Sequence, residues 1–432
     1  MIRIMQAGDP ALENIMNRHM AGKEAAAAIV AEIIKTVREQ GDRALCAYTA
    51  DFDQVKLTPG QLKVIPEEIE EAYGLVEKTT LESICLARDN IASFHRKQLE
   101  KSWFAPSDNG VILGQLVRPL ARAGIYVPGG TAVLFSSVLM NAIPAMVAGV
   151  KEIVMVTPPG KDGKLNPYTL VAAAEAGVTE IYKAGGAQAI AALAYGTETI
   201  KPVDKITGPG NIYVTLAKQQ VYGQVGIDML AGPSEVLVVA DETADASYVA
   251  ADLLSQAEHD VLASAVLLTP VESLAEKVRE EVARQTELLP RRDIVTRSLT
   301  DYSAIVITRD LAQAVQMANR FAPEHLELMV KEPFNLLCQI TNAGAVFLGS
   351  YSPEPVGDYW AGPNHVLPTG GTARFYSPLS VDTFIKKSSI ISYTREALEQ
   401  AGGHIADMAV KEGLDAHANA IRIRLEGKGE NQ

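Results

Sequence analysis

The 432-residue chain has few cysteines and no long uninterrupted apolar run. Its three cysteines, Cys46, Cys85 and Cys338, lie far apart, which argues against a disulfide framework and fits a reducing compartment. Each has apolar neighbours, so a buried thiol is favoured over a nucleophile. No stretch approaches the roughly 20 apolar residues of a membrane span, and the first residues show no signal-peptide pattern. We therefore expect a cytoplasmic protein.

Cationic side chains are also scarce relative to acidic ones. The chain has 39 Lys and Arg against 52 Asp and Glu, a formal net charge of −13. This excess argues against a general nucleic-acid or anionic-membrane binder. Apolar residues make up 47% of the chain, which is ample for a buried core, and its length favours two or more domains.

The common nucleotide and metal fingerprints are missing. No GxGxxG follows a strand-like segment, and neither GxxxxGK[ST] nor HExxH occurs. Two glycine turns, PGGT at 128–131 and TGPGN at 207–211, would let the backbone approach a phosphate closely. Each turn alone is weak evidence for a nucleotide site.

Hydrophobic periodicity divides the chain into regions. Residues 23 to about 101 show helical spacing, whereas from Ala123 short apolar strands alternate with helices, and this alternation restarts at Glu235. Such alternation predicts right-handed βαβ units on mostly parallel sheets. We expect two α/β units, the second resuming after Gly232, and helical texture after Ser377. The pattern alone does not say which unit the early helices join.

A helix predicted over 244–259 carries the first candidate site. Gln256 and His259 lie three residues apart, so both project on one side, beside the apolar stripe. Zinc accepts imidazole nitrogen and oxygen donors. The alternative is that Gln256 and His259 are polar residues at the border of the apolar face of this helix and bind no metal.

A glycine- and proline-rich loop after the strand-like AGAVFLG carries Asp358 and His365. Loops at the carboxyl ends of parallel strands commonly hold functional groups. The alternative is a rigid surface loop with solvated side chains.

Glu324 and His325 follow Pro323, which ends a predicted helix, so we place them at the entry to a new strand. An adjacent carboxyl and imidazole can exchange protons near neutral pH, although a helix-terminal charge pair is the simpler alternative. Near the C-terminus, Asp415 is predicted to cap a short helix that carries His417. A histidine there could equally be a core residue.

Taken together, the segments resemble the histidinol dehydrogenase family. The family's order and spacing are met by GIYVPGGTA, GGAQAIAALAYGT, KITGPGNIYV, AGPSE, QAEHD, APEHLEL, VGDYWAGPNHVLPTGGTARF and EGLDAH, and the similarity runs from about residue 20 to 425. The resemblance implies an α/β fold with two incomplete Rossmann-like parallel-sheet domains and small helical N- and C-terminal pieces, like that of aldehyde dehydrogenases. It also implies a homodimer with each active site at the interface.

The implied domains are an N-terminal arm (1–22), a first α/β domain with most metal and catalytic residues (23–125 plus 233–380), a second, NAD-binding α/β domain (126–232) and a C-terminal dimerisation domain (381–432). One zinc ion per subunit would be bound by Gln256, His259, Asp358 and His417. NAD would contact Tyr126, Gln188 and Asn211, and Glu324 and His325 would be the acid–base residues. The substrate would contact Ser234, Gln256, His259, His325, Asp358, His365, Glu412 and His417.

The activity implied by the resemblance is the NAD-dependent, four-electron oxidation of L-histidinol through L-histidinaldehyde to L-histidine, the last steps of histidine biosynthesis, with zinc positioning the substrate. The sequence leaves three alternative functions open. A zinc hydrolase would cleave an amide and form no NADH. A noncatalytic small-molecule binding protein would show no turnover. A relative acting on another amino alcohol would differ only in pocket shape.

Overall fold

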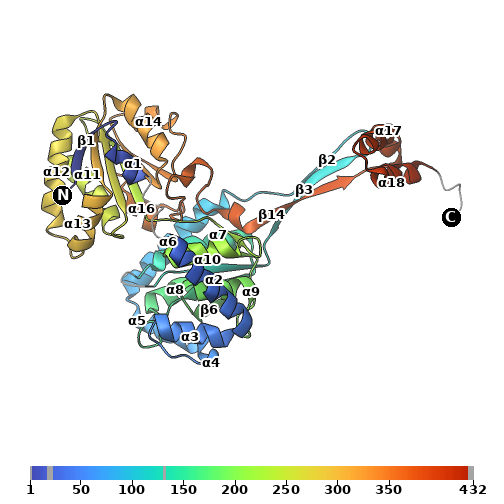
Figure 1. Cartoon of the computed structure of the whole chain (residues 1–432), viewed down its shortest axis with the longest axis horizontal. Coiled ribbons are helices and arrows are strands. Elements are labelled where there is room, and N and C mark those ends of the chain that lie inside the picture. Colours follow the sequence, from blue (N-terminus) through green and yellow to red (C-terminus); the bar gives the residue numbers. More distant parts are fainter. Residues whose placement is uncertain (1, 17–22, 130–132, 427–432) are drawn as a thin grey trace. The chain divides into compact units, whose positions relative to one another are not determined.

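The structure is a computed structural model that describes residues 2–16, 23–129 and 133–426 (Figure 1). The chain forms two compact units, one from Met1–Gln98 and Leu120–Phe384, the other from Leu99–Pro119 and Ile385–Gln432. Among the described residues, no helix combines the length and the apolar composition that crossing a membrane would require.

The first unit contains a six-stranded parallel sheet with helices on both faces. In spatial order its strands are β1 (Arg3–Gln6), β11 (Ala304–Ile307), β10 (Ser264–Thr269), β9 (Glu235–Ala240), β12 (His325–Met329) and β13 (Ala345–Leu348). Successive residues of β9 point to opposite faces, so Val236 and Val238 join one core and Leu237 and Val239 the other.

Helices cover these two cores (Figure 1). One core receives side chains from α11 (Ala246–Ala257), α12 (Glu272–Thr286) and α13 (Arg292–Asp301). The other receives them from α1 (Ala11–Met16), α14 (Leu311–Phe321) and α15 (Pro333–Leu337). A short helix, α16 (Glu354–Tyr359), follows β13.

A five-stranded parallel sheet forms the rest of this unit. Its strands in spatial order are β6 (Glu180–Lys183), β5 (Glu152–Thr157), β4 (Arg122–Tyr126), β7 (Lys205–Thr207) and β8 (Gly226–Ile227), and its connecting helices are α7 (Phe135–Ala148), α8 (Pro167–Glu175), α9 (Gly186–Tyr195) and α10 (Ile212–Val221). The chain runs outward in one direction from β4 to β6, then returns to the other side of β4 at β7. This reversal is the switch point at which open α/β sheets bind ligands. The predicted pair of parallel-sheet α/β folds is confirmed.

The early helices pack on the five-stranded sheet. They are α2 (Lys23–Gln40), α3 (Asp42–Phe52), α4 (Pro59–Leu62), α5 (Pro66–Leu75) and α6 (Lys78–Arg96). Val30 of α2 shares a core with Ile190 of α9, and Ile84 of α6 shares another with Val138 of α7. This packing differs from the predicted grouping of residues 23–125 with 233–380. An amphipathic pattern shows that a helix buries one face, but not against which sheet.

The terminal pieces are not purely helical, contrary to expectation. β1 joins the six-stranded sheet, whereas residues 17–22 of the predicted N-terminal arm lie outside the described residues. The second unit has an antiparallel sheet in the order β14 (Ile385–Ser392), β3 (Ile112–Pro119) and β2 (Trp103–Pro106), with helices α17 (Arg395–Lys411) and α18 (Asp415–Leu425). β14 was missed because its partner strand lies far away in the sequence.

A buried ion pair holds the turn that follows β7. The side chains of Lys218 and Asp228 are 2% and 1% exposed and in contact. Lys218 Nζ also donates to Gly208 O at 2.9 Å, and Gly208 N donates to Asp228 Oδ2 at 2.8 Å. Gly208 has φ +116°, and a Cβ there would lie 2.1 Å from Tyr126 O. The pair therefore fixes the backbone at the switch point.

Lys218→Met should lower the free energy of unfolding by about 3–5 kcal/mol, because it leaves the Asp228 carboxylate buried without its cation. Urea titration followed by circular dichroism measures the change. The double variant Lys218→Met/Asp228→Asn should recover most of the loss, and Lys201→Met, at an exposed position, should cost little. A loss below about 1 kcal/mol in the single variant would contradict the structural role of the pair.

Candidate active site

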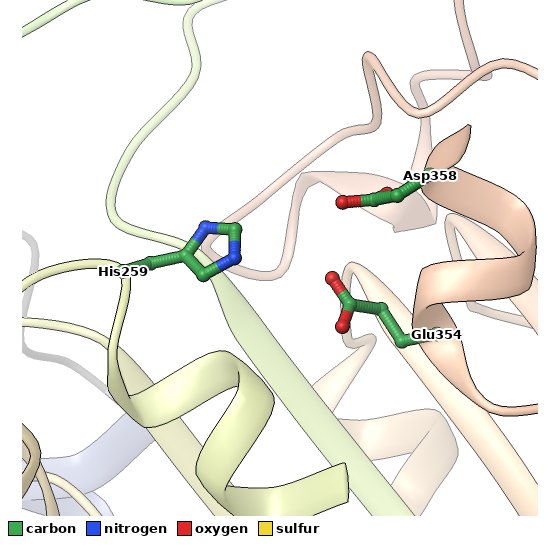
Figure 2. Close-up of side chains that lie close together, drawn as sticks. All are labelled: His259, Glu354 and Asp358. Carbon is green, nitrogen blue, oxygen red and sulfur yellow. The ribbon is translucent and has the colours of Figure 1, made fainter. Parts of the chain in front are cut away.

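Three side chains of the first unit converge at one point (Figure 2). His259 lies just after α11, and Glu354 and Asp358 lie four residues apart on α16, so both carboxylates project on one side. One ligand atom from each residue lies within 4.8 Å of the others. The cluster therefore combines two residues that the sequence singled out, His259 and Asp358, with one that it did not.

Glu354 is the residue that sequence reasoning missed. It is 2% exposed, and its Oε2 lies 3.0 Å from Ser255 Oγ. Its backbone N donates to Glu327 Oε1 at 3.0 Å, which fixes the start of α16 against β12. The i, i+4 spacing of Glu354 and Asp358 after Pro353 was a usable signal, because it places two acids on one face of a short helix.

Burial raises the pKa of both carboxyls. The pKa of Asp358 rises to about 6. That of Glu354 rises to about 7, through burial and then through the charge of Asp358. Two buried acids side by side cannot both ionise cheaply, so they either share a proton or bind a cation.

Gln256 adds an unsatisfied amide beside this cluster. Its side chain is fully buried, and neither Oε1 nor Nε2 has a hydrogen-bond partner among the described residues. Gln256 follows Ser255, the residue that contacts Glu354, and its carbonyl accepts from His259 N at 3.2 Å. A buried amide without a partner is rare in native proteins and is costly. Imidazole, carboxylate and amide donors together fit a divalent cation such as zinc.

Glu324 and His325 are both held by the backbone of Glu235. Glu235 N donates to Glu324 Oε2 at 2.9 Å, and Glu235 O lies 3.1 Å from His325 Nδ1. A carbonyl only accepts, so Nδ1 carries the proton and Nε2 keeps its lone pair. Nε2 is buried and has no partner among the described residues. His325 thus presents a free basic nitrogen.

The pKa values of Glu324 and His325 depend in part on residues of the cluster formed by His259, Glu354 and Asp358. Burial, with a smaller contribution from the neighbouring imidazoles of His259 and His365, lowers the pKa of His325 to about 3, so its imidazole is neutral at pH 7. Burial raises the pKa of Glu324 well above its ordinary value, opposed by the hydrogen bond from Glu235. The charges of Asp358 and Glu354 also raise it. A carboxyl tuned upward is suited to proton transfer near neutral pH.

These groups lie at the amino edge of the six-stranded sheet. Glu235 and His325 are the first residues of β9 and β12, and Ser264, the first residue of β10, donates its N–H to Ser234 O at 3.1 Å. The expected placement of a site at the carboxyl ends of strands is therefore wrong for this sheet. The expected position of Glu324 and His325 is confirmed, because α14 ends at Phe321 and Ala322 has φ 51°.

His365 contacts Asp358 as well. Its Nδ1 lies 3.2 Å from Asp358 O and its Nε2 3.4 Å from Ser137 Oγ on α7. Burial lowers the pKa of His365 to about 4, so it is a neutral hydrogen-bonding group at pH 7. The imidazole of His365 therefore helps to hold Asp358 in place through its contact with the Asp358 carbonyl oxygen.

Tyr126, Gln188 and Asn211 all lie at the carboxyl edge of the five-stranded sheet. Tyr126 ends β4, and its hydroxyl accepts from Gly186 N at 3.2 Å. Gln188 lies in the first turn of α9, and its buried Oε1 has no partner among the described residues. Asn211 caps α10 by accepting from Tyr213 N and Val214 N. Residues 130 and 131 of the PGGT turn lie outside the described residues.

Glu412 and His417 belong to the second compact unit, and both are exposed. Glu412 follows α17, and His417 lies in the first turn of α18. The predicted cap by Asp415 is wrong, because Leu414 occupies the N-cap position and Asp415 is the first helical residue. An acid in the first turn still interacts favourably with the helix dipole.

Comparison with known proteins identifies the family of the chain. The family model described as histidinol dehydrogenase matches residues 16–425. A histidinol dehydrogenase of Heliobacterium mobile is 61% identical over 397 residues, which cover 92% of this chain and 93% of that protein. One from Moorella thermoacetica is 60% identical over 407 residues, covering 94% and 96%. The crystal structure of histidinol dehydrogenase from Elizabethkingia anophelis matches with a TM-score of 0.93 and 42% identity over 98% of each chain. The chain therefore belongs to the histidinol dehydrogenase family.

Proposed function

We propose that this protein oxidises L-histidinol through L-histidinaldehyde to L-histidine, with NAD as the electron acceptor and zinc as the bound metal. The observation that carries the proposal is the convergence of His259, Glu354 and Asp358 beside the buried Glu324–His325 pair. A metal-ligating cluster and an acid–base pair at one sheet edge are what a metal-assisted alcohol oxidation requires.

Three residues of the first unit would hold the zinc ion, namely Gln256, His259 and Asp358, and His417 would be the fourth ligand, with one ion per subunit. The unpaired Gln256 amide and the raised pKa of Asp358 support this assignment, since a cation satisfies both. The substrate would lie among Ser234, Gln256, His259, His325, Asp358, His365, Glu412 and His417. A zinc ion held by these residues would supply a Lewis acid that coordinates the substrate's amine and imidazole, and this would orient the carbon that loses hydride.

His325 would serve as the base in the first oxidation. Its Nε2 would accept the hydroxyl proton of histidinol. The carbon that bears this hydroxyl group would at the same time give up hydride to the nicotinamide ring. The products of this step are the aldehyde, one NADH and one proton. Because Glu235 O holds the Nδ1–H, the imidazole cannot rotate away from this orientation.

Glu324 would act in the second oxidation. Its carboxylate removes a proton from water as the water oxygen bonds to the aldehyde carbon. The adduct would be the hydrate anion, with its negative charge on the former carbonyl oxygen, and loss of hydride from it to a second NAD would give the carboxylic acid. The hydrogen bond from Glu235 N stabilises the ionised form that this step needs.

NAD would bind at the carboxyl edge of the five-stranded sheet, in contact with Tyr126, Gln188 and Asn211. The strand order reverses between β4 and β7, and the N-termini of α9 and α10 lie at this edge. Helix N-termini favour the negative charge of a pyrophosphate. The 207–211 turn, held by the Lys218–Asp228 pair, brings the backbone close to that position.

Removal of the metal should abolish NADH formation from histidinol, and added zinc should restore it. Cobalt or manganese should substitute in part, because nitrogen and oxygen ligands do not select zinc strictly. Elemental analysis measures the metal content of the protein, and absorbance at the NADH band measures its activity in the same sample. Full activity in protein verified as metal-free would overturn the metal assignment.

Glu354→Gln should weaken zinc binding about 10- to 100-fold, as loss of a group that supports a metal ligand does. Competition with a zinc chelator measures this without turnover. The exposed Glu280→Gln on α12 is the matched control and should bind zinc like the wild type. Unchanged zinc affinity in Glu354→Gln would contradict a role for this carboxylate at the metal.

Glu324→Gln should impair oxidation of the aldehyde more than oxidation of the alcohol, because only the second step deprotonates water. His325→Ala should impair both, by about 10²–10⁴-fold for a lost general base. Single-turnover NADH formation started from histidinol and from histidinaldehyde separates the two steps. Equal losses in both steps for Glu324→Gln would refute this division of roles.

We further propose a cytoplasmic homodimer in which Glu412 and His417 of one chain complete the site of the other. The support is that both residues belong to a compact unit separate from the one that carries His259 and Asp358. A two-fold dimer repeats such a contact twice and gives two equivalent sites.

Mixing subunits tests this arrangement. His259→Ala and His417→Ala homodimers should each be inactive, but a heterodimer would place both lesions in one site and leave the other intact. Purified, differently tagged heterodimers should therefore regain NADH formation. Heterodimers of normal mass and fold that stay inactive would show that His417 serves its own chain.

A further inference from the structure

Asp53 lies at the same sheet edge as the proposed NAD site. Helix α3 begins beside Glu198, whose Oε2 accepts from Asp42 N at 2.7 Å, and Glu198 lies just beyond the C-terminal end of α9. Because α9 starts at the carboxyl edge, its C-terminal end marks the amino edge. Asp53, at the opposite end of α3, is therefore at the carboxyl edge, and its charge acts on Tyr126 there.

The chain that follows Asp53 runs beside the turns after β5 and β6. A Cβ at Gly163 would lie 3.6 Å from Val55 Cγ1 and 3.8 Å from Leu57 Cδ2, and Gly163 belongs to the β5–α8 connection. Pro158, directly after β5, packs so close to Gly185 that a Cβ there would lie 2.6 Å from the proline Cβ. Asp53 thus sits on the β4–β5–β6 side of the switch point.

The Asp53 side chain is half-buried. Its Oδ2 is buried and lacks a hydrogen-bond partner among the described residues. Burial raises its pKa to about 6. It also occupies the C-cap of α3, where the negative end of the helix dipole disfavours an acid.

The next residue is strained as well. Gln54 has φ 60°, a left-handed conformation that few non-glycine residues adopt. Buried unpaired acids and backbone strain concentrate where a ligand later supplies the missing contacts.

Dinucleotide-binding sheets commonly hold the adenosine ribose with an acid at the end of the second strand, which accepts hydrogen bonds from the ribose hydroxyls. Here that strand is β5, which ends at Thr157 and is followed by Pro158 and Pro159, so no acid stands at its end. We propose that Asp53, supplied by α3, accepts hydrogen bonds from the adenosine ribose hydroxyls of NAD and rejects the 2′-phosphate of NADP. This inference rests on the proposed use of NAD.

Asp53→Asn should raise KM for NAD roughly 10- to 100-fold with little change in kcat, as loss of a charge-assisted hydrogen bond does. The same variant should reduce the preference for NAD over NADP by a similar factor, because the negative charge that repels the 2′-phosphate of NADP is gone. Asp51→Asn, an exposed acid on the same helix end, is the matched control and should leave both unchanged. Equal KM values for NAD in the wild type and Asp53→Asn would overturn the proposal.

An NAD analogue that lacks the adenosine 2′-hydroxyl separates a direct contact from a merely structural effect. The wild type should bind this analogue more weakly than NAD, by about the factor by which Asp53→Asn weakens the binding of NAD. Asp53→Asn should bind the analogue only slightly more weakly than it binds NAD. Additive losses would show that Asp53 does not touch this hydroxyl. Thermal unfolding without ligand should leave Asp53→Asn at least as stable as the wild type, since the variant removes a half-buried negative charge from the C-terminal end of α3.

Direct binding of NADH, followed by its fluorescence, keeps this test apart from the proposed reaction. If the wild type binds NADH but does not oxidise histidinol, the proposed function fails, while weaker binding by Asp53→Asn still supports the ribose contact. If the wild type oxidises histidinol and both proteins bind NADH equally, the ribose contact fails and the function stands. A wild type that binds no dinucleotide would overturn both.

Discussion

Uncompensated negative charge at the amino edge of the six-stranded sheet is the constraint around which this part of the molecule is arranged. Behind Glu354 and Asp358 lie two more buried acids, Asp252 of α11 and Glu327 of β12, and burial raises the pKa of both. Glu327 in turn accepts the N–H that starts α16. Carboxyls packed this closely require shared protons or a cation. The segments α11, β12 and α16 are thus held around a position where positive charge lowers the energy.

The proposed acid–base pair depends on strand register rather than on loop shape. Glu324 and His325 are both held by the backbone of Glu235, and this is possible because β12 pairs with β9 so that His325 lies opposite Val236. A slip of one residue would turn every side chain of β12 to the other face of the sheet. Both strands are buried on both sides, so this register is strongly specified. The positions of the proposed reactive atoms therefore follow from the pairing of two fully buried strands.

Local patterns in the sequence predicted the parts of this architecture that are local in origin. Alternating short apolar strands and helices indicated both parallel sheets, and Pro323 indicated that Glu324 and His325 enter a strand. The packing partner of α2 and the pairing of β14 with β3 were not predictable, because both depend on segments far apart in the chain. Glu354 and Asp53 were overlooked for a related reason: the burial of Glu354 and the missing partner of Asp53 Oδ2 depend on packing that the local sequence does not show.

The two proposed ligands differ in charge and are assigned to opposite edges of the two sheets, and the helix directions suit this assignment. In a parallel sheet the connecting helices run antiparallel to the strands, so their C-terminal ends gather at the amino edge and their N-terminal ends at the carboxyl edge. α11 ends at the amino edge of the six-stranded sheet, where His259 follows it and the dipole favours a cation. α9 and α10 begin at the carboxyl edge of the five-stranded sheet, where the positive ends of their helix dipoles favour a pyrophosphate. The negative end of α3 lies at that second edge, and there it carries Asp53, whose proposed partners are hydroxyl groups rather than phosphate. Each proposed ligand group thus meets the helix end whose partial charge suits it.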